Sequence, residues 1–361
     1  MISTLEKKIL TAFPLAQWNR RKVCLAISGG ADSVALLCAT SHIAEDAGCL
    51  ANLMVVTVDH QSRGQESDGD VAFVLDLSKR LNIESLACQI NLDELEQEEK
   101  RQGSWESAAR TLRYKLLFKT AKEHGARFVA TAHHRDDQLE TLLFRLFRGT
   151  GLDGLRGVSS YRTVDESTTL VRPLLQASKQ EIIDYLNEIG QSYRIDSSNS
   201  SPEYARNRVR NELVPVLESI FPNRWQNALL RISQQANETE EYFNEELIKL
   251  DARIDKTQKR EEKYRKASLA VPESSLNVLN EEYDGVEIPL TPLQESSNEI
   301  VRRYFRRLWK RMGWSLGSMG AKEWNRLAQA VREKVAVNQF PDNIFVLFPN
   351  ESTVRIERKP K

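Results

Sequence analysis

The chain is 361 residues long, with 40% hydrophobic and 28% charged residues and a formal net charge of zero. This length predicts two domains, and the hydrophobic fraction is sufficient for buried cores. No apolar run approaches the ~18–20 residues that span a bilayer, so we expect no membrane segment. The four cysteines are scattered and form no CxxC pair. This spacing argues against a zinc ribbon or structural disulfides and predicts a reducing, cytoplasmic location.

Charge is distributed unevenly along the chain. Acidic residues crowd 93–99 and 238–246, and basic residues crowd 302–311. A neutral total argues weakly against a nucleic-acid partner, but the basic run predicts a locally positive surface near the C-terminus.

The first part of the chain alternates predicted strands with predicted helices. The N-terminal segment has the pattern of an amphipathic helix and lacks the long apolar region of a signal peptide. Strands are predicted at 23–27, 53–58, 85–90 and 127–131, and helices at 34–47, 66–81, 104–124 and 136–147. The alternation predicts an α/β fold in which helices cover both faces of a Rossmann-like parallel sheet.

The second part of the chain is predicted to be mainly helical. A glycine-rich turn at 149–157 precedes a helix at 178–189, and a polar loop at 196–202 precedes helical sequence up to 217. Helices are then predicted at 223–265 and 299–335, loops at 266–298, and a terminal hairpin from 344–348 and 353–356. We therefore predict a first domain at 1–217 and a mainly helical second domain at 218–361.

A pair of glycines stands where the first strand passes into the first long helix. Adjacent glycines allow positive φ and a close approach of the backbone to a ligand, and a helix N-terminus attracts anions through its unpaired N–H groups. The pattern is neither GxxxxGK[ST] nor GxGxxG. The alternative is a plain glycine-rich turn with capping side chains. We call this segment the phosphate loop; it consists of Ser28, Gly29, Gly30, Ala31, Asp32 and Ser33.

Two other polar segments follow predicted strands. Asp59-His60 follows the second strand and Ala132-His133-His134 follows the fourth. Ligands of parallel sheets bind beyond the carboxyl ends of the strands, so both segments and the phosphate loop are predicted to line one crevice.

A series of blocks follows within 23–217: SGGADS, VDHQSRGQESDGD, WESAARTLRYKLL, ATAHHRDDQLETLLFRLFRGTGLDGLRGV, VRPLL with SKQEIIDYL, and DSSNSSPEYARNRVRNELVPVL. In this order they resemble the tRNA(Ile)-lysidine synthetase family of PP-loop (N-type) ATP pyrophosphatases. The resemblance implies ligation of L-lysine to C2 of the wobble cytidine in the CAU anticodon of tRNA(Ile), through an adenylated cytidine. It also implies that ATP is split to AMP and pyrophosphate and that decoding changes from AUG to AUA. The resemblance ends near residue 217, so our prediction that the second domain binds tRNA rests on its basic run.

The candidate catalytic residues are Asp32, Arg113 and His133. Asp32 stands beside an anion site, where we expect it to bind Mg²⁺ or act as a base; capping of the helix is the alternative. Arg113 shares a helix face with Arg110 and is expected to compensate charge on phosphate, with a surface ion pair as the alternative. His133 is a candidate proton acceptor because the ordinary pKa of histidine is near neutrality.

The candidate lysine-binding residues are Asp137, Glu140 and Arg206. The two acids follow His133 at i+4 and i+7, on one helix face. Two carboxylates suit the ammonium groups of lysine, in agreement with the resemblance; acids that stabilise a helix N-terminus are the alternative. Arg206 follows a polar loop and is expected to hold the α-carboxylate of lysine or a phosphate, with a structural salt bridge as the alternative.

The basic run near the C-terminus has the charge and the aromatic faces of an RNA-binding surface. The alternative is a solvated helix whose aromatic residues enter the core, and both interpretations hold if the arginines face outward. The candidate tRNA-binding residues are Arg302, Arg303, Arg306 and Arg307, interleaved with Tyr304, Phe305 and Trp309.

Two other functions compete with lysidine synthesis. A PP-loop tRNA thiolase needs a cysteine that carries sulfur or binds a cluster, but Cys24, Cys38, Cys49 and Cys88 lie in predicted strands or helices without paired spacing. A catalytically idle RNA-binding protein that keeps the nucleotide loop as a sensor has no use for the complete set of blocks. The sequence leaves the oligomeric state open, with a homodimer as one alternative.

Overall fold

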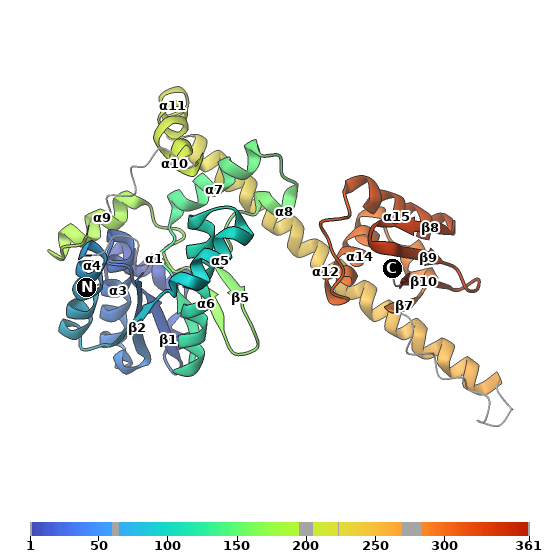
Figure 1. Ribbon diagram of the computed structural model, residues 1–361, viewed down its shortest axis with the longest axis horizontal. Helices are drawn as coiled ribbons and strands as arrows, with labels where there is room; N and C mark the ends of the chain where they lie inside the picture. Colours follow the sequence, from blue (N-terminus) through green and yellow to red (C-terminus); the bar gives the residue numbers. More distant parts are fainter. Residues whose placement is uncertain (1, 60–64, 195–204, 223, 269–283, 360–361) are drawn as a thin grey trace. The chain divides into compact units, whose positions relative to one another are not determined.

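The computed structural model describes residues 2–59, 65–194, 205–222, 224–268 and 284–359. The chain divides into two compact units, Met1–Ala236 and Asn237–Lys361 (Figure 1). The division falls within one helix, α12 (Trp225–Ser268), which contributes residues to both units. The domain boundary after residue 217 stays a prediction.

A mostly parallel sheet forms the centre of the first unit. Within the described residues its strand order is β3–β2–β1–β4–β6–β5, and each neighbouring pair is parallel except β6 with β5. The strands are β1 (Lys22–Ala26), β2 (Leu53–Asp59), β3 (Glu84–Gln89), β4 (Ala126–Ala130), β5 (Tyr161–Thr163) and β6 (Thr169–Val171). The first four confirm the predicted strands. The last two were not predicted, because three residues are too few to show an alternating pattern.

Helices cover both faces of this sheet, as predicted. On β1, Val23 and Leu25 pack in a core with α1, α3 and α9, whereas Cys24 packs with Leu117 and Ala121 of α6. Successive side chains of a strand point to opposite faces, so these cores lie on opposite sides of the sheet (Figure 1). The helices are α1 (Thr4–Ala12), α2 (Leu15–Trp18), α3 (Ala31–Asp46), α4 (Gln65–Arg80), α5 (Leu92–Gln102), α6 (Trp105–Glu123), α7 (Arg135–Phe147), α8 (Leu152–Leu155), α9 (Lys179–Glu188), α10 (Ala205–Arg208) and α11 (Val214–Ile220), with a 3-10 turn at Leu50–Asn52 and a π-helical turn at Val209–Leu213.

Local sequence signals determine where several helices begin and end. A capping box begins α9: the Ser178 hydroxyl accepts the Glu181 N–H at 3.2 Å, and the Glu181 carboxylate accepts the Ser178 N–H at 2.8 Å. The acidic run at 93–99 forms most of α5, a helix that is not among those predicted from the sequence. Asn91 caps its start, and Gly103, with φ of +76°, ends it.

The second unit combines helices with a four-stranded antiparallel sheet. Within the described residues the strand order is β7–β10–β9–β8. The pairing of β9 with β10 confirms the terminal hairpin, and the predicted helices are present together with this added sheet. Besides the end of α12, the elements are β7 (Asp284–Pro289), α13 (Leu290–Gln294), α14 (Asn298–Arg311), α15 (Ala321–Glu333), β8 (Val337–Phe340), a 3-10 turn at Pro341–Asn343, β9 (Ile344–Leu347) and β10 (Thr353–Arg358). Among the helices in the described ranges, none has the length and apolar character needed to cross a bilayer.

Candidate active site

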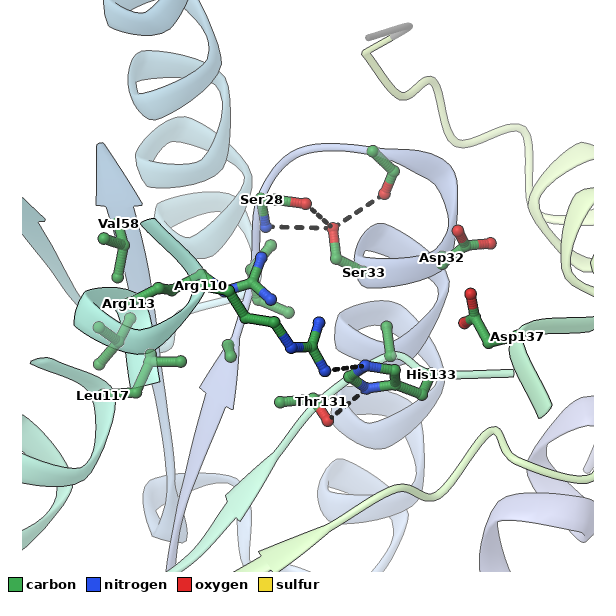
Figure 2. Close-up of a pocket in the computed structure, with 15 residues that line it drawn as sticks. Ser28, Asp32, Ser33, Val58, Arg110, Arg113, Leu117, Thr131, His133 and Asp137 are labelled. Atoms are coloured by element: carbon green, nitrogen blue, oxygen red, sulfur yellow. Dashed lines mark hydrogen bonds between the residues drawn. The ribbon is translucent and has the colours of Figure 1, made fainter. Parts of the chain in front are cut away.

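The phosphate loop is closed by its own hydroxyl groups between β1 and α3. The Ser33 hydroxyl donates to the Gly30 carbonyl at 2.9 Å and accepts the Ser28 N–H at 3.2 Å (Figure 2). Gly30 is the N-cap of α3 and has no side chain to accept the N–H groups of the first turn. Those N–H groups and the positive end of the helix dipole therefore favour an anion here.

A pocket of about 250 Å³ opens at this loop. Figure 2 shows the guanidinium groups of α6 on one side and the carboxylates of α3 and α7 on the other, so the pocket has a positive and a negative wall. The predicted crevice is confirmed for the phosphate loop and the segment after β4. Of the remaining segment, Asp59 is buried and His60 lies outside the described residues. The polar lining includes Ser28, Asp32, Arg110, Arg113, His133 and Asp137.

The positive wall of the pocket consists of Arg110 and Arg113, and both guanidinium groups lie near the ring of Tyr114. The guanidinium carbons of Arg110 and Arg113 lie 5.3 and 5.5 Å from the ring centroid, so one aromatic side chain of α6 supports both. Burial lowers the pKa of Arg113, and the charge of Arg110 lowers it further. Among the residues that the structure describes, neither arginine forms an ion pair with a carboxylate. Two such charges held together favour an anionic ligand.

His133 lies next to this wall. Its Nδ1 is 3.0 Å from the Thr131 hydroxyl, and its Nε2 is 3.4 Å from Nη2 of Arg110 (Figure 2). A guanidinium can only donate, so Nε2 accepts, and the proton of the neutral ring is assigned to Nδ1. Burial lowers the pKa of His133; the Asp137 carboxylate opposes this shift, and nearby arginines add to it. The ring is therefore neutral at neutral pH and is a weak base.

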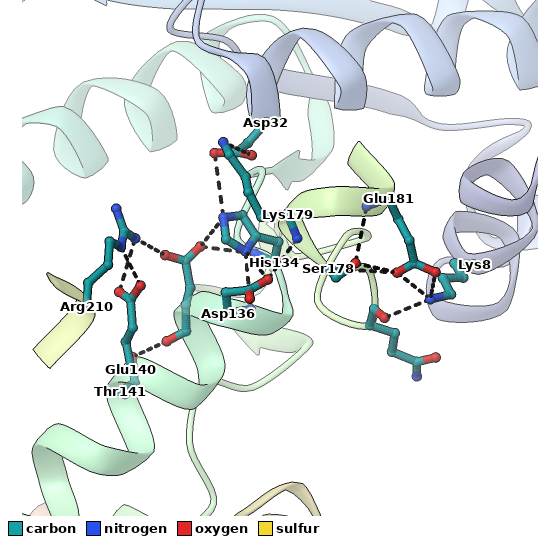
Figure 3. A network of polar contacts seen from close by, with 12 residues as sticks. Lys8, Asp32, His134, Asp136, Glu140, Thr141, Ser178, Lys179, Glu181 and Arg210 are labelled. Atoms are coloured by element: carbon teal, nitrogen blue, oxygen red, sulfur yellow. Dashed lines mark hydrogen bonds and ion pairs between the residues drawn. The ribbon is translucent and has the colours of Figure 1, made fainter. Parts of the chain in front are cut away.

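Three carboxylates surround the buried His134, a residue that is not among the candidates predicted from the sequence. Its Nε2 lies 3.6 Å from Asp32 and 3.7 Å from Asp137, and its Nδ1 lies 3.4 Å from Asp136 (Figure 3). Burial by itself lowers the pKa of His134, but hydrogen bonds to Asp136 and Asp32 and the charge of Asp137 raise it to about 10. The ring of His134 therefore lies among three carboxylates, those of Asp32, Asp136 and Asp137. Its only signal in the sequence is its position beside His133.

Asp32 also pairs with a lysine that is distant in the sequence. Nζ of Lys179, at the start of α9, lies 2.7 Å from Oδ1 of Asp32 (Figure 3). Burial raises the pKa of Asp32, but His134 and Lys179 together lower it overall. The backbone N–H of Lys179 donates to Asp136 at 2.8 Å, which joins α9 to the same network. The block SKQEIIDYL contains this lysine, but nothing in its pattern indicates the contact.

Arg210 approaches both of the acids that were selected for lysine binding. Its Nε and Nη2 donate to the two oxygens of Glu140 at 2.6 and 3.1 Å, and Nη2 lies 3.8 Å from Asp137. Glu140 is 4% exposed and lies beside the described pocket lining, whereas Asp137 is part of that lining. Arg206 is in α10, and its side chain lies outside the described part of the chain. The arginine that the structure places at these carboxylates is Arg210, which belongs to the same sequence block as Arg206.

The arginines selected for tRNA binding lie on α14 in the second unit, and Arg302, Arg303 and Arg307 form ion pairs with carboxylates of that unit. Arg306 is exposed, and Tyr304, Phe305 and Trp309 are buried. The aromatic residues thus enter the core, while contact of this helix with tRNA stays a prediction. The ion pairs are Arg302 with Glu299, Arg303 with Glu299 and Glu240, and Arg307 with Asp251.

The sequence matches a known family over most of the first unit and beyond. The profile described as PP-loop domain matches residues 1–217. The tRNA(Ile)-lysidine synthase of Rhodopirellula baltica is 32% identical over 326 residues, which cover 85% of this chain and 78% of that protein. The chain belongs to the tRNA(Ile)-lysidine synthase family. The resemblance described from the sequence blocks is thereby confirmed.

Other members of the family are longer than this chain. The enzyme of Bacteroides thetaiotaomicron is 38% identical over 237 residues, which cover 64% of this chain and 51% of that protein. The enzyme of Treponema pallidum is 42% identical over 215 residues, which cover 58% of this chain and 43% of that protein. The chain thus spans about half the length of these two relatives.

One solved structure shows the same fold in a different enzyme. The U34-tRNA thiolase NcsA from Methanococcus maripaludis, which has a [4Fe-4S] cluster, aligns with a TM-score of 0.53 over 65% of this chain and 78% of its own. The sequences are 18% identical, so the likeness establishes the shared fold alone. Among the described residues that line the pocket of the present chain, none is a cysteine.

Proposed function

We propose that this chain ligates L-lysine to C2 of the wobble cytidine in the CAU-anticodon tRNA(Ile), through an adenylated cytidine, with ATP split to AMP and pyrophosphate. The observation that carries the proposal is one pocket with an anion loop and two arginines facing a wall of carboxylates. Such a pocket suits a reaction that joins an anionic nucleotide to a cationic amino acid. Membership of the lysidine synthase family supports it.

The positive side of the pocket suits ATP cleavage. When the cytidine oxygen attacks the α-phosphorus, pyrophosphate leaves and negative charge develops on the phosphate oxygens. Donors that are already held in place stabilise that charge without reorganisation. The N–H groups at the start of α3 and the guanidinium of Arg113 supply such donors. His133 is a weak base, so its proposed part is to hold Arg110 in place by accepting its hydrogen bond.

Asp32 suits a shared Mg²⁺ site. Mg²⁺ in proteins is usually held by one or two carboxylates together with substrate phosphates and water. Within the described ranges no group of three or more acidic, histidine or cysteine side chains could hold a metal by itself. Asp32 belongs to the phosphate loop, so it fits a Mg²⁺ site that one carboxylate shares with substrate phosphates and water. The ion, when bound, neutralises phosphate charge, while Lys179 and His134 balance the charge of Asp32 within the protein.

The negative side of the pocket suits lysine. Asp137 lines the pocket and is the proposed contact for an ammonium group of the substrate. Glu140 is bound at both oxygens by Arg210, so its proposed part is to hold that arginine beside Asp137. Arg206 remains the proposed partner of the lysine α-carboxylate.

The second unit is the proposed tRNA-binding part, with Arg302, Arg303, Arg306 and Arg307 as the proposed contacts. Three of these arginines would have to bind phosphate while they are paired with acids, which weakens the electrostatic argument for them. The oligomeric state stays open, with a homodimer as one alternative, and gel filtration with light scattering would test it.

The test of the reaction uses purified protein, ATP, Mg²⁺, labelled lysine and total tRNA. We expect ATP-dependent label only on the isoleucine tRNA with the CAU anticodon, and no label with the Asp32→Asn variant. Transfer of sulfur to the tRNA would instead establish the thiolase alternative. Binding of tRNA without any ATP-dependent label would establish the idle RNA-binding protein. Burial raises the pKa of Cys24 to about 12, which suits a structural cysteine better than a sulfur carrier.

A further inference from the structure

A short segment after α9 holds the outer side of the phosphate loop. The backbone N–H of Arg194 donates to the Gly29 carbonyl at 2.9 Å, and Arg194 forms an isolated parallel bridge with Gly30. Gly29 has φ of +87°, a conformation that residues with a side chain rarely adopt. The phosphate loop is therefore held at Gly29, its residue with positive φ, by an N–H donor that lies 165 positions further along the chain.

The side chain of Arg194 fastens this contact to a third segment. Its Nε donates to Oδ1 of Asp70 on α4 at 2.8 Å. The aliphatic part of the Arg194 side chain lies against Gly29: a Cβ added to Gly29 would be 3.5 Å from Cγ of Arg194. The guanidinium group lies against Gly69: a Cβ added to Gly69 would be 3.5 Å from Nη2 of Arg194. Arg194 thus joins the phosphate loop, the start of α4 and the segment after α9.

The geometry of the peptide unit connects this contact to the pocket. A trans peptide is planar, and its carbonyl and N–H point in opposite directions. When Arg194 holds the Gly29 carbonyl on the outer side, the N–H of Gly30 must point the other way. Gly30 lines the pocket, so this N–H is directed toward the anion site. Arg194 lies outside that lining and acts through the loop.

We propose that Arg194, fastened by Asp70, is a positioning residue that orients the Gly30 N–H toward the phosphates of ATP. The inference rests on the proposed function, because it takes the anion at the loop to be the polyphosphate of ATP. Its consequence is specific: losing the Arg194–Asp70 pair weakens the binding of ATP and leaves the binding of lysine unchanged.

The first experiment measures binding of a non-hydrolysable ATP analogue to the purified full chain by calorimetry, without tRNA. We expect Arg194→Ala and Asp70→Asn each to weaken binding about two- to fivefold, the size expected for a partly exposed ion pair. The double variant should bind no more weakly than Arg194→Ala, and Arg194→Lys should recover part of the loss. Arg80→Ala is the matched control, because it breaks a similar exposed pair with Asp76 on the same helix and should bind as the wild type does.

The second experiment separates positioning from folding. In steady-state assays Arg194→Ala should raise the KM for ATP and leave the KM for lysine and the thermal unfolding midpoint unchanged. Arg194→Pro, which also lacks the N–H donor, should raise the KM for ATP further. The inference is overturned if wild type, Arg194→Ala and Asp70→Asn bind the analogue equally, or if both KM values rise together with a loss of thermal stability. Wild-type protein that fails to bind the analogue at all would overturn the proposed function and this inference with it.

Discussion

The arginines of α6 and those of α14 lie in opposite electrostatic surroundings. Arg110 and Arg113 share one aromatic ring and, within the described residues, have no carboxylate partner. Arg303 and Arg307 on α14 are instead bound by carboxylates of their own unit. The positive charge of Arg110 and Arg113 is therefore available to a ligand. The charge of Arg303 and Arg307 is instead neutralised by carboxylates of their own unit, and these ion pairs stabilise that unit. A run of arginines in a sequence therefore indicates charge, and the surrounding residues decide whether that charge is available.

The largest effect is expected from Arg113→Ala, which removes charge from the positive wall. The rate of pyrophosphate release in the presence of tRNA should fall about a hundred- to a thousandfold, as when one preorganised donor is removed from other active sites. Thermal stability should not fall with it, because no ion pair is broken. The control Arg355→Ala breaks a pair with Glu287 in the second unit and should leave the rate unchanged. A rate for Arg113→Ala close to that of wild type would contradict the role of the positive wall.

The next effect is expected from Asp137→Asn, which tests the opposite wall. The KM for lysine should rise about ten- to a hundredfold, the usual size of a lost hydrogen bond to a charged group. Pyrophosphate release should be spared, because Asp137 lies on the wall of the pocket opposite Arg110 and Arg113. An unchanged KM for lysine, or an equal loss of ATP binding, would remove Asp137 from the lysine site.

Arg303→Ala tests the structural role of arginines on α14. This side chain is 12% exposed, pairs with Glu240 and Glu299, and lies 4.1 Å from the ring centroid of Phe243. Its loss should lower the free energy of unfolding by about 1–3 kcal/mol, because Glu240 and Glu299 each lose one ion-pair partner. Urea unfolding followed by tryptophan fluorescence measures this change. The exposed Lys310→Ala variant is the control, and equal stability of the two variants would mean that the pairs are not structural.

The smallest effect is expected at a pair in the first unit, between the partly exposed His42 and the buried Glu6. The hydrogen bond to Glu6 raises the pKa of His42 above its ordinary value of 6.5. A raised folded-state pKa contributes stability that is fully present below pH 6.5 and is lost as pH rises through the folded-state pKa. The His42 side chain is 44% exposed, so the contribution should stay below about 0.5 kcal/mol. Unfolding midpoints of wild type and His42→Gln should therefore differ slightly at pH 5.5 and converge by pH 9; a difference that grows with pH contradicts this assignment.

Much of the first unit follows from local patterns in the sequence. The four strands β1 to β4 show as apolar runs, and the phosphate loop shows as two glycines between a strand and a helix. The helix spacing of Arg110 and Arg113 placed both on one face, and the structure directs both into the pocket. Shorter elements escaped prediction: β5 and β6 have too few residues for a pattern, and the acidic α5 lacks a clear apolar stripe.

The sequence by itself determined the family, the first four strands and the position of the phosphate loop, because each depends on residues that are neighbours in the chain. Only the tertiary structure decided the partners of Asp32, Glu140 and Gly29: Lys179, Arg210 and Arg194 come from 147, 70 and 165 positions away. Contacts at such separations depend on how helices pack on the sheet, and no local spacing records them. The same reason explains why the sequence alone could not tell the available arginines of α6 from the paired arginines of α14.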